Sequence, residues 1–202
     1  MLTLTDVWRP APAAPRAAGP RARSLSLAFD LALTLVGSAL IALSARVAIP
    51  LPFSPVPVTG QTFAVLLVGA ALGRWRGAAA VIAYLAEGAA GLPVFAGPNV
   101  GPAVLVGPTG GYLFGFIPGA WLCGLLAECG WDRRAGTTIL SMILGNVAIF
   151  AVALPWLARY VGASNVWAMG FWPFVPGDVA KIGLAAAALP LAWKWLGRGA
   201  GQ

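Results

Sequence analysis

"TTILSMILGNVAIFAVALPWLA", residues 137–158, contains no charged side chain and few polar ones. A transmembrane helix needs about 20 mostly apolar residues to cross the hydrocarbon layer of a bilayer, and this stretch supplies them. The rest of the chain has the same character, because 59% of its 202 residues are hydrophobic and only 9% are charged. A soluble domain of this size cannot bury so much apolar surface, so the sequence predicts an integral membrane protein.

Apolar runs of this kind recur along the chain, at residues about 25–49, 56–73, 77–93, 110–128, 137–158 and 176–196. We therefore expect an all-α membrane domain of six transmembrane helices over residues 25–198. Residues 1–24 are rich in Pro, Ala and Arg and lack the apolar core and cleavage site of a signal peptide. They predict a flexible, basic cytoplasmic tail.

The basic residues gather on alternate connections between the runs. With the tail in the cytoplasm, ten of the thirteen lie on that side: Arg9, Arg16, Arg21, Arg23, Arg74, Arg76, Arg133, Arg134, Lys194 and Arg198. Arg46 and Arg159 lie near the opposite side, and Lys181 lies at the start of the last run. This bias predicts that both termini are cytoplasmic. The net charge of +7 then reflects membrane topology, and no nucleic-acid partner is expected.

Missing residue types exclude several kinds of chemistry. The chain has no His, which removes the usual general base and the commonest metal ligand. Its two cysteines, Cys123 and Cys129, lack CxxC spacing, and neither Lys follows a Gly as a phosphate-binding loop requires. We therefore expect no metal, no cofactor and no ATP hydrolysis by this chain.

A few polar side chains remain at similar depth in the apolar runs, below the outer connections. They are Thr59 and Gln61 at the start of the second run, Tyr84 and Glu87 near the end of the third, and Asp178 and Lys181 at the start of the sixth. A charge deep in a bilayer costs about 2.5–3.5 kcal/mol on insertion scales. We interpret this group as a pocket for a polar ligand, roofed by Pro- and Gly-rich loops, with Phe53, Phe95, Phe171 and Trp172 as candidate walls.

Two plainer interpretations of the last pair stay open. Asp178 and Lys181 could simply neutralise one another, or Asp178 could cap the helix that follows Pro176–Gly177. Neither explains Glu87 with Tyr84 on a different run.

Small residues recur at four-residue spacing and predict close helix packing. They are Gly69 and Gly73 in the second run, and Gly111, Gly115 and Gly119 in the fourth. Ala28 and Ala32 form a similar pair in the first run, where either internal packing or a partner helix could use the smooth surface.

Four motifs carry a family resemblance by their order and spacing: "PVPVTGQT", "AYLAEGAAGLPVFAG", "GPTGGYLFGF" and "PFVPGDVAKIGLAA". Over about residues 50–188 the chain resembles the BioY family, the substrate-capturing S components of energy-coupling-factor (ECF) biotin transporters. The resemblance implies a six-helix S-component fold in the bacterial cytoplasmic (inner) membrane. It also implies biotin as ligand and a partner module of a transmembrane coupling protein and two ATPases, which agrees with the missing phosphate-binding loop.

The resemblance further implies which residues bind substrate: Thr59, Gln61, Tyr84, Glu87, Phe95, Gly97, Asp178 and Lys181, with Asn146 added from the fifth run. Biotin offers a ureido ring with two N–H donors and one carbonyl, a thioether ring and an anionic valerate tail. Asp178 can accept from the ureido N–H groups. Lys181 can donate to the ureido carbonyl or pair with the carboxylate.

The predicted function is high-affinity capture and uptake of biotin as the substrate-specific subunit of an ECF-type transporter. The alternative is a self-sufficient secondary transporter, with Glu87 or Asp178 as a proton-coupling carboxylate, although no inverted repeat of broken helices is visible. An enzyme is not expected, because the chain lacks a metal cluster and a nucleophile–base pair.

Overall fold

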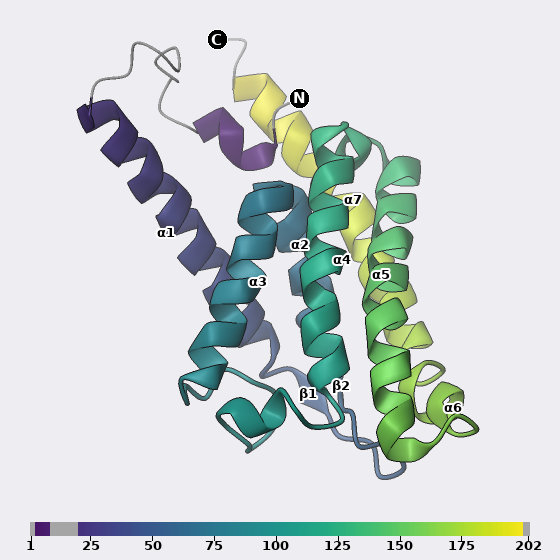
Figure 1. Cartoon of the computed structure of the whole chain (residues 1–202). Coiled ribbons are helices and arrows are strands. Elements are labelled where there is room, and N and C mark those ends of the chain that lie inside the picture. Colours follow the sequence, from purple (N-terminus) through teal and green to yellow (C-terminus); the bar gives the residue numbers. More distant parts are fainter. Residues whose placement is uncertain (1–2, 9–19, 200–202) are drawn as a thin grey trace.

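The computed structural model describes residues 3–8 and 20–199, and most of these residues are helical (Figure 1). In chain order the elements are η1 (Leu4–Trp8), α1 (Pro20–Ser44), β1 (Ala48–Ile49), β2 (Val58–Thr59), α2 (Gln61–Leu72), α3 (Arg74–Ala89), η2 (Pro102–Val104), α4 (Gly110–Glu128), η3 (Trp131–Arg133), α5 (Ala135–Val161), α6 (Val166–Gly170) and α7 (Val175–Gly199). The two short strands pair antiparallel, with Ala48 opposite Thr59.

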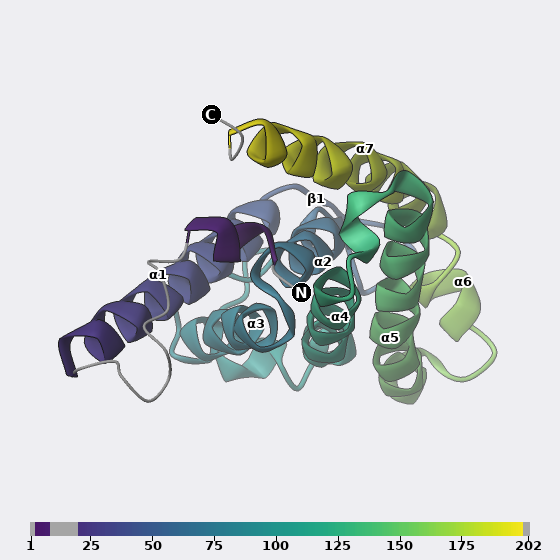
Figure 2. The same ribbon diagram turned by 90° about the horizontal axis from the view of Figure 1, so that it is seen from above.

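The helices form one bundle with two different ends. Helices α2, α3, α4 and α5 stand side by side, α7 lies against α5 and α2, and α1 packs mainly on α3 and diverges from the bundle toward its own N-terminus (Figures 1 and 2). Residues 45–60, 90–109 and 162–174 gather at one end, which we call the loop end. The opposite end, which we call the basic end, holds η1, η3 and the α2–α3 junction with Arg74 and Arg76.

Within residues 3–8 and 20–199, four segments are long and apolar enough to cross a membrane: Ser24–Ser44, Gly110–Glu128, Ala135–Val161 and Val166–Leu196. Four of the six expected transmembrane helices are therefore confirmed by their length and composition. Helix α2 is apolar but has only 12 residues, and α3 has 16 and carries Arg74, Arg76 and Glu87. At a rise of 1.5 Å per residue these helices are about 18 and 24 Å long, short of the roughly 30 Å hydrocarbon layer.

The second predicted run, residues 56–73, begins too early because its first residues are not helical. Val58 and Thr59 pair with the strand that follows α1, and α2 starts only after Gly60. At its other end, Gly73 adopts φ +86°, which ends α2 and lets α3 start at the next residue. Helix α1 lies about five residues closer to the N-terminus than the first predicted run, 25–49, because it begins at Pro20 and ends at Ser44.

The expected close packing of glycines is present where α4 meets α5. A Cβ atom on Gly115 would lie 2.7 Å from the Ile149 carbonyl oxygen, and one on Gly119 would lie 2.7 Å from the Ile149 side chain. Ile149 itself is fully buried in the core of the bundle. Absence of a side chain at these glycines therefore sets the distance between the two helices.

Part of the predicted N-terminal tail is structured. Residues 4–8 form η1, the Thr5 hydroxyl donates to the Ala71 carbonyl at 3.2 Å, and the Asp6 carboxylate pairs with Arg76 at the start of α3. Thr3 is buried beneath them. Two parts of the predicted flexible tail, residues 1–24, are thus helical: residues 4–8 form η1, and residues 20–24 belong to α1. Residues 9–19 lie outside the described part of the chain.

Asp132 links two elements at the basic end. It lies in η3, its side chain is buried, and its Oδ2 accepts a hydrogen bond of 2.5 Å from the Trp193 indole N–H of α7. The Arg133 guanidinium lies over the same indole, 4.5 Å from the ring centre. Burial raises the pKa of Asp132 above its usual value, an effect that the Trp193 hydrogen bond opposes only in part.

Asp132→Asn should flatten the pH dependence of stability. The pKa of Asp132 is higher in the folded than in the unfolded chain, so this group stabilises the fold fully only below its unfolded value near 3.8. That contribution is lost as the pH rises through the folded-state pKa. Asn cannot ionise and still accepts from Trp193. We expect the variant to gain stability relative to the parent as the pH rises above about 4, measured by thermal unfolding in detergent; a difference in stability that does not change with pH would contradict the assignment.

Candidate substrate-binding site

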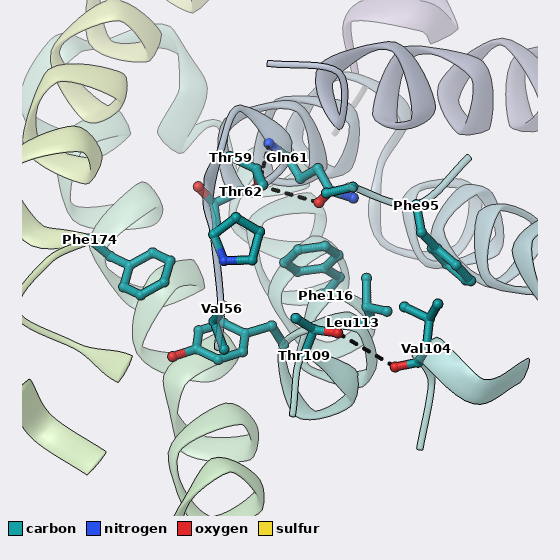
Figure 3. A pocket seen from close by; sticks show the side chains of 13 residues that line it. Val56, Thr59, Gln61, Thr62, Phe95, Val104, Thr109, Leu113, Phe116 and Phe174 are labelled. Carbon is teal, nitrogen blue, oxygen red and sulfur yellow. Dashed lines mark hydrogen bonds between the residues drawn. The ribbon is translucent and has the colours of Figure 1, made fainter. Parts of the chain in front are cut away.

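A narrow cavity opens at the loop end of the bundle (Figure 3). Its volume is about 40 Å³, and side chains from the β2–α2 segment, the 95–109 loop, α4 and the start of α7 line it: Val56, Pro57, Thr59, Gln61, Thr62, Phe95, Ala96, Val104, Thr109, Tyr112, Leu113, Phe116 and Phe174. Pro57, Ala96, Val104 and Thr109 also line a wider space of about 710 Å³, which we call the vestibule. The cavity and the vestibule therefore lie next to each other and share part of their lining.

Aromatic rings form the apolar walls of the cavity. Phe95 is buried edge-on against Tyr84 with ring centres 5.5 Å apart, and Tyr112 stacks on Phe174 at the same separation. Phe116 projects from α4 toward the space between them (Figure 3). Of the walls expected from sequence, only Phe95 lines the cavity. The others, Phe53, Phe171 and Trp172, do not: Phe53 and Trp172 are exposed, and Phe171 packs on Phe150.

Lys181 joins α7 to the start of α2. Its Nζ donates to the Thr59 carbonyl at 2.8 Å, to the Thr62 hydroxyl at 2.7 Å and to Asp178 Oδ1 at 3.1 Å. The Lys181 and Asp178 side chains are 17% and 8% exposed, so the ion pair is largely desolvated. Thr62 in turn donates to Asp178 Oδ1 at 3.3 Å. The acid and the base therefore act as one unit with the first turn of α2.

The second carboxylate oxygen of Asp178, Oδ2, takes no part in these hydrogen bonds. Oδ2 is buried and has no hydrogen-bond partner within the described residues 3–8 and 20–199. Capping of α7 does not use this carboxylate, because Asp178 already lies inside the first turn and its backbone N–H bonds to the Phe174 carbonyl at 2.9 Å. A buried acceptor without a partner is energetically unfavourable, so Oδ2 is suited to receive a donor from a ligand.

A second branch of the polar network lies on the other side of Thr59. Its hydroxyl donates to Gln61 Oε1 at 3.3 Å, and the Gln61 amide donates to the Tyr84 hydroxyl at 2.5 Å. Tyr84 is fully buried and reaches the Val94 carbonyl in the loop behind it. Through Thr59, this branch is connected to the Lys181 cluster. The structure thus joins Thr59, Gln61, Tyr84, Asp178 and Lys181 in one network.

The remaining predicted site residues lie around this network. Gly97 lines the vestibule and has φ +85°. Asn146 does not line the main cavity but borders a small void beside Lys181, with its Oδ1 buried and unpaired among the described residues. Glu87 points elsewhere: its Oε2 accepts a 2.6 Å hydrogen bond from the buried Ser38 hydroxyl of α1. Glu87 and Tyr84 therefore have different partners despite their three-residue spacing.

Two residues of the site were not predicted from the sequence. Thr62 bridges Lys181 and Asp178, and Tyr112 lines the cavity while its hydroxyl bonds to the Gly170 carbonyl. Both lie within motifs that carry the family resemblance, "PVPVTGQT" and "GPTGGYLFGF". Neither residue is charged, so their positions within these motifs were the sequence feature that could have identified them.

The model of the BioY family matches residues 18–198, nearly all of the described bundle. The chain belongs to the BioY family. Among its relatives, biotin transporter BioY of Thermotoga maritima is 45% identical over 150 residues, covering 74% of this chain and 86% of the relative. Biotin transporter BioY of Rhizobium etli is 39% identical over 166 residues, covering 78% and 89%.

A solved structure agrees with this membership. The crystal structure of the S-component for biotin from an ECF-type ABC transporter matches this BioY chain with a TM-score of 0.74 at 26% identity, covering 88% of this chain and 95% of that one. Together with the four apolar segments, this match makes the chain a multi-pass membrane protein with an S-component fold. The relatives are transporters, so the expectation that the chain is not an enzyme is confirmed.

Proposed function

We propose that this chain captures biotin at the loop-end cavity and serves as the substrate-specific subunit of an ECF-type transporter. The observation that carries the proposal is the buried Asp178 Oδ2 without a partner, held by Lys181 and Thr62 behind an aromatic-walled cavity. The relatives named as biotin transporters and the biotin S-component of similar structure support the choice of ligand.

The ligand's chemistry fits the network. Asp178 does not itself line the cavity, but it contacts Thr62, which does, and a ureido N–H group of biotin can donate to Asp178 Oδ2. Thr59 and Gln61 line the cavity and offer neutral hydrogen bonds. Phe95, Phe116 and the other rings can cover the thioether ring. The bicyclic ring is larger than the 40 Å³ cavity, so binding requires some of these aromatic side chains to shift.

For the membrane arrangement, we propose six crossing helices with both termini in the cytoplasm and the loop end facing outward. The basic end carries Arg74, Arg76, Arg133 and Arg134, which supports a cytoplasmic location. Helices α2 and α3 are short for the bilayer, but α1 and α4 flank them in the bundle. In this orientation the vestibule opens to the outside, where substrate is captured.

The direct test is a biotin titration of the purified chain in detergent without ATP. The cavity is built by this chain alone and no motif here handles nucleotide, so binding should be complete without ATP. Failure to bind, or an absolute requirement for ATP, would contradict the proposed function.

Transport, in contrast, should depend on a coupling membrane protein that docks on α1. Ala28 and Ala32 are both exposed on the part of α1 that diverges from the bundle, so internal packing does not account for them. Small exposed residues at four-residue spacing permit close approach of a partner helix.

Ala28→Trp should therefore reduce biotin uptake by cells that contain the whole transporter, while biotin binding by the purified chain stays unchanged. Ala151→Trp on α5 is the matched control, because Ala151 is also an exposed alanine of a spanning helix. It should change neither property. If Ala28→Trp lowers binding as much as uptake, the docking assignment is wrong.

The alternative of self-sufficient, proton-coupled transport is separated by liposomes that contain only this chain. Under the proposed function, a proton gradient should not drive accumulation of biotin. Accumulation that follows the gradient would favour the secondary transporter and identify the membrane carboxylates as the next residues to replace.

A further inference from the structure

The cation next to the cavity has no free donor. A lysine ammonium group has three N–H bonds. Lys181 directs its three contacts to the Thr59 carbonyl, the Thr62 hydroxyl and Asp178 Oδ1, at 2.7–3.1 Å. An anionic ligand group could bind this Lys only by displacing one of them, and the buried Asp178 beside it would repel that anion. The carboxylate of the ligand is therefore not expected in the deep part of the site.

The vestibule also offers no cation. Its lining among the described residues consists of apolar, Gly, Pro and neutral polar side chains, such as Ser54 and Asn99. The two Arg residues nearest the loop end have other partners. Arg46 donates to the Pro93 carbonyl, and the Arg159 guanidinium lies 5.7 Å from the centre of the Trp156 ring. With a volume of about 710 Å³, the vestibule falls in the range of pockets that hold drug-sized ligands.

We propose that the site accepts biotin esters and amides, including biotinyl-lysine, with the ureido ring in the cavity and the substituent, which has no net charge, in the vestibule. This inference rests on the proposed function and widens its substrate class from the free acid to conjugates. It follows from the order of contacts: the unpaired acceptor and the used cation both contact Thr62, which lines the cavity, and the uncharged vestibule shares four lining residues with that cavity.

The test is competition against labelled biotin on the purified full-length chain, with unlabelled biotin, biotin methyl ester and biotinyl-lysine as competitors. We expect the ester and the amide to bind within tenfold of biotin. A charge-assisted hydrogen bond to the carboxylate would make the ester about 10- to 150-fold weaker. Such a loss, with biotin itself bound tightly, would overturn this inference and leave the proposed function intact. If biotin does not bind, the proposed function fails.

Two variants locate the substituent. Ala103 is exposed and lines the vestibule, so Ala103→Trp should weaken biotinyl-lysine more than biotin. Ala163→Trp, an exposed alanine in the α5–α6 connection, should leave the ratio of the two affinities unchanged. Equal losses for both ligands with Ala103→Trp would contradict the placement.

Arg46→Gln tests the nearest competing explanation. If Arg46 leaves Pro93 to pair with the carboxylate, this variant should weaken biotin and spare the methyl ester, which would overturn the inference. Under our proposal both ligands respond alike to the change.

Discussion

Asp178→Asn is expected to weaken biotin binding by about 10- to 150-fold. A hydrogen bond to a charged group is worth roughly 1.5–3 kcal/mol, and Oδ2 is the one described buried carboxylate oxygen of the Lys181 cluster without a partner. Asn has one acceptor oxygen, so it cannot accept from Lys181 and Thr62 on one side and from a ureido N–H group on the other, and it carries no charge. Isothermal titration of purified protein measures the loss directly.

The double variant Asp178→Asn/Lys181→Gln separates ligand recognition from charge balance. Removing Asp178 alone leaves a largely buried ammonium without its counter-ion, which can destabilise the fold. The double variant removes both charges and should recover thermal stability. If the two residues only neutralise one another, it should also recover binding. We expect binding to stay weak, and parental affinity in the double variant would refute the site.

Gly69→Ala is expected to have the largest effect on folding. Gly69 lies where three helices meet: an added Cβ would overlap the Ala120 carbonyl of α4, and Gly77 of α3 packs against the same position. Backbone atoms cannot rotate away as a side chain can, so α2 and α4 would have to separate. Overpacking of this kind destabilises by about 1–3 kcal/mol, which for a chain of this size lowers Tm by roughly 2–12 °C.

Gly136→Ala is the matched control. Gly136 lies in the exposed first turn of α5, and an added Cβ would meet nothing within 4 Å. The substitution should be neutral or stabilise by about 0.4–1 kcal/mol, because it restricts the unfolded chain. Equal destabilisation by both changes would mean that the contact of Gly69 with α4 is not what limits stability.

Much of this architecture follows from local sequence. The predicted run 110–128 coincides with α4, and the glycine spacing within it indicated close helix packing, which the structure places against α5. The pairing of Asp178 with Lys181 followed from their three-residue spacing on one helix. Local patterns of this kind depend only on the period of a helix, and the period is known without the fold.

The features that the sequence did not predict depend on contacts between residues far apart in the chain. Three-residue spacing put Glu87 with Tyr84, but Ser38 on α1 takes up the Glu87 carboxylate. Helix α2 is shorter than the predicted run 56–73 because residues 58–59 pair as a strand with residues 48–49, which follow α1. Thr62 is uncharged, and although it lies in one of the family motifs, its contact with Asp178 of α7 could not be read from the sequence.

The bond from Lys181 to the Thr59 carbonyl joins residues 122 positions apart. Chains are made from the N-terminus and membrane helices enter the bilayer in that order, so the recognition network cannot close until the last helix is in place. A fragment that ends before α7 would contain the vestibule loops but would lack Asp178, the proposed acceptor for the ligand. Under the proposed function, biotin should therefore bind only completed chains, and biotin added during synthesis should rescue slow-assembling variants only at the final stage of their biogenesis.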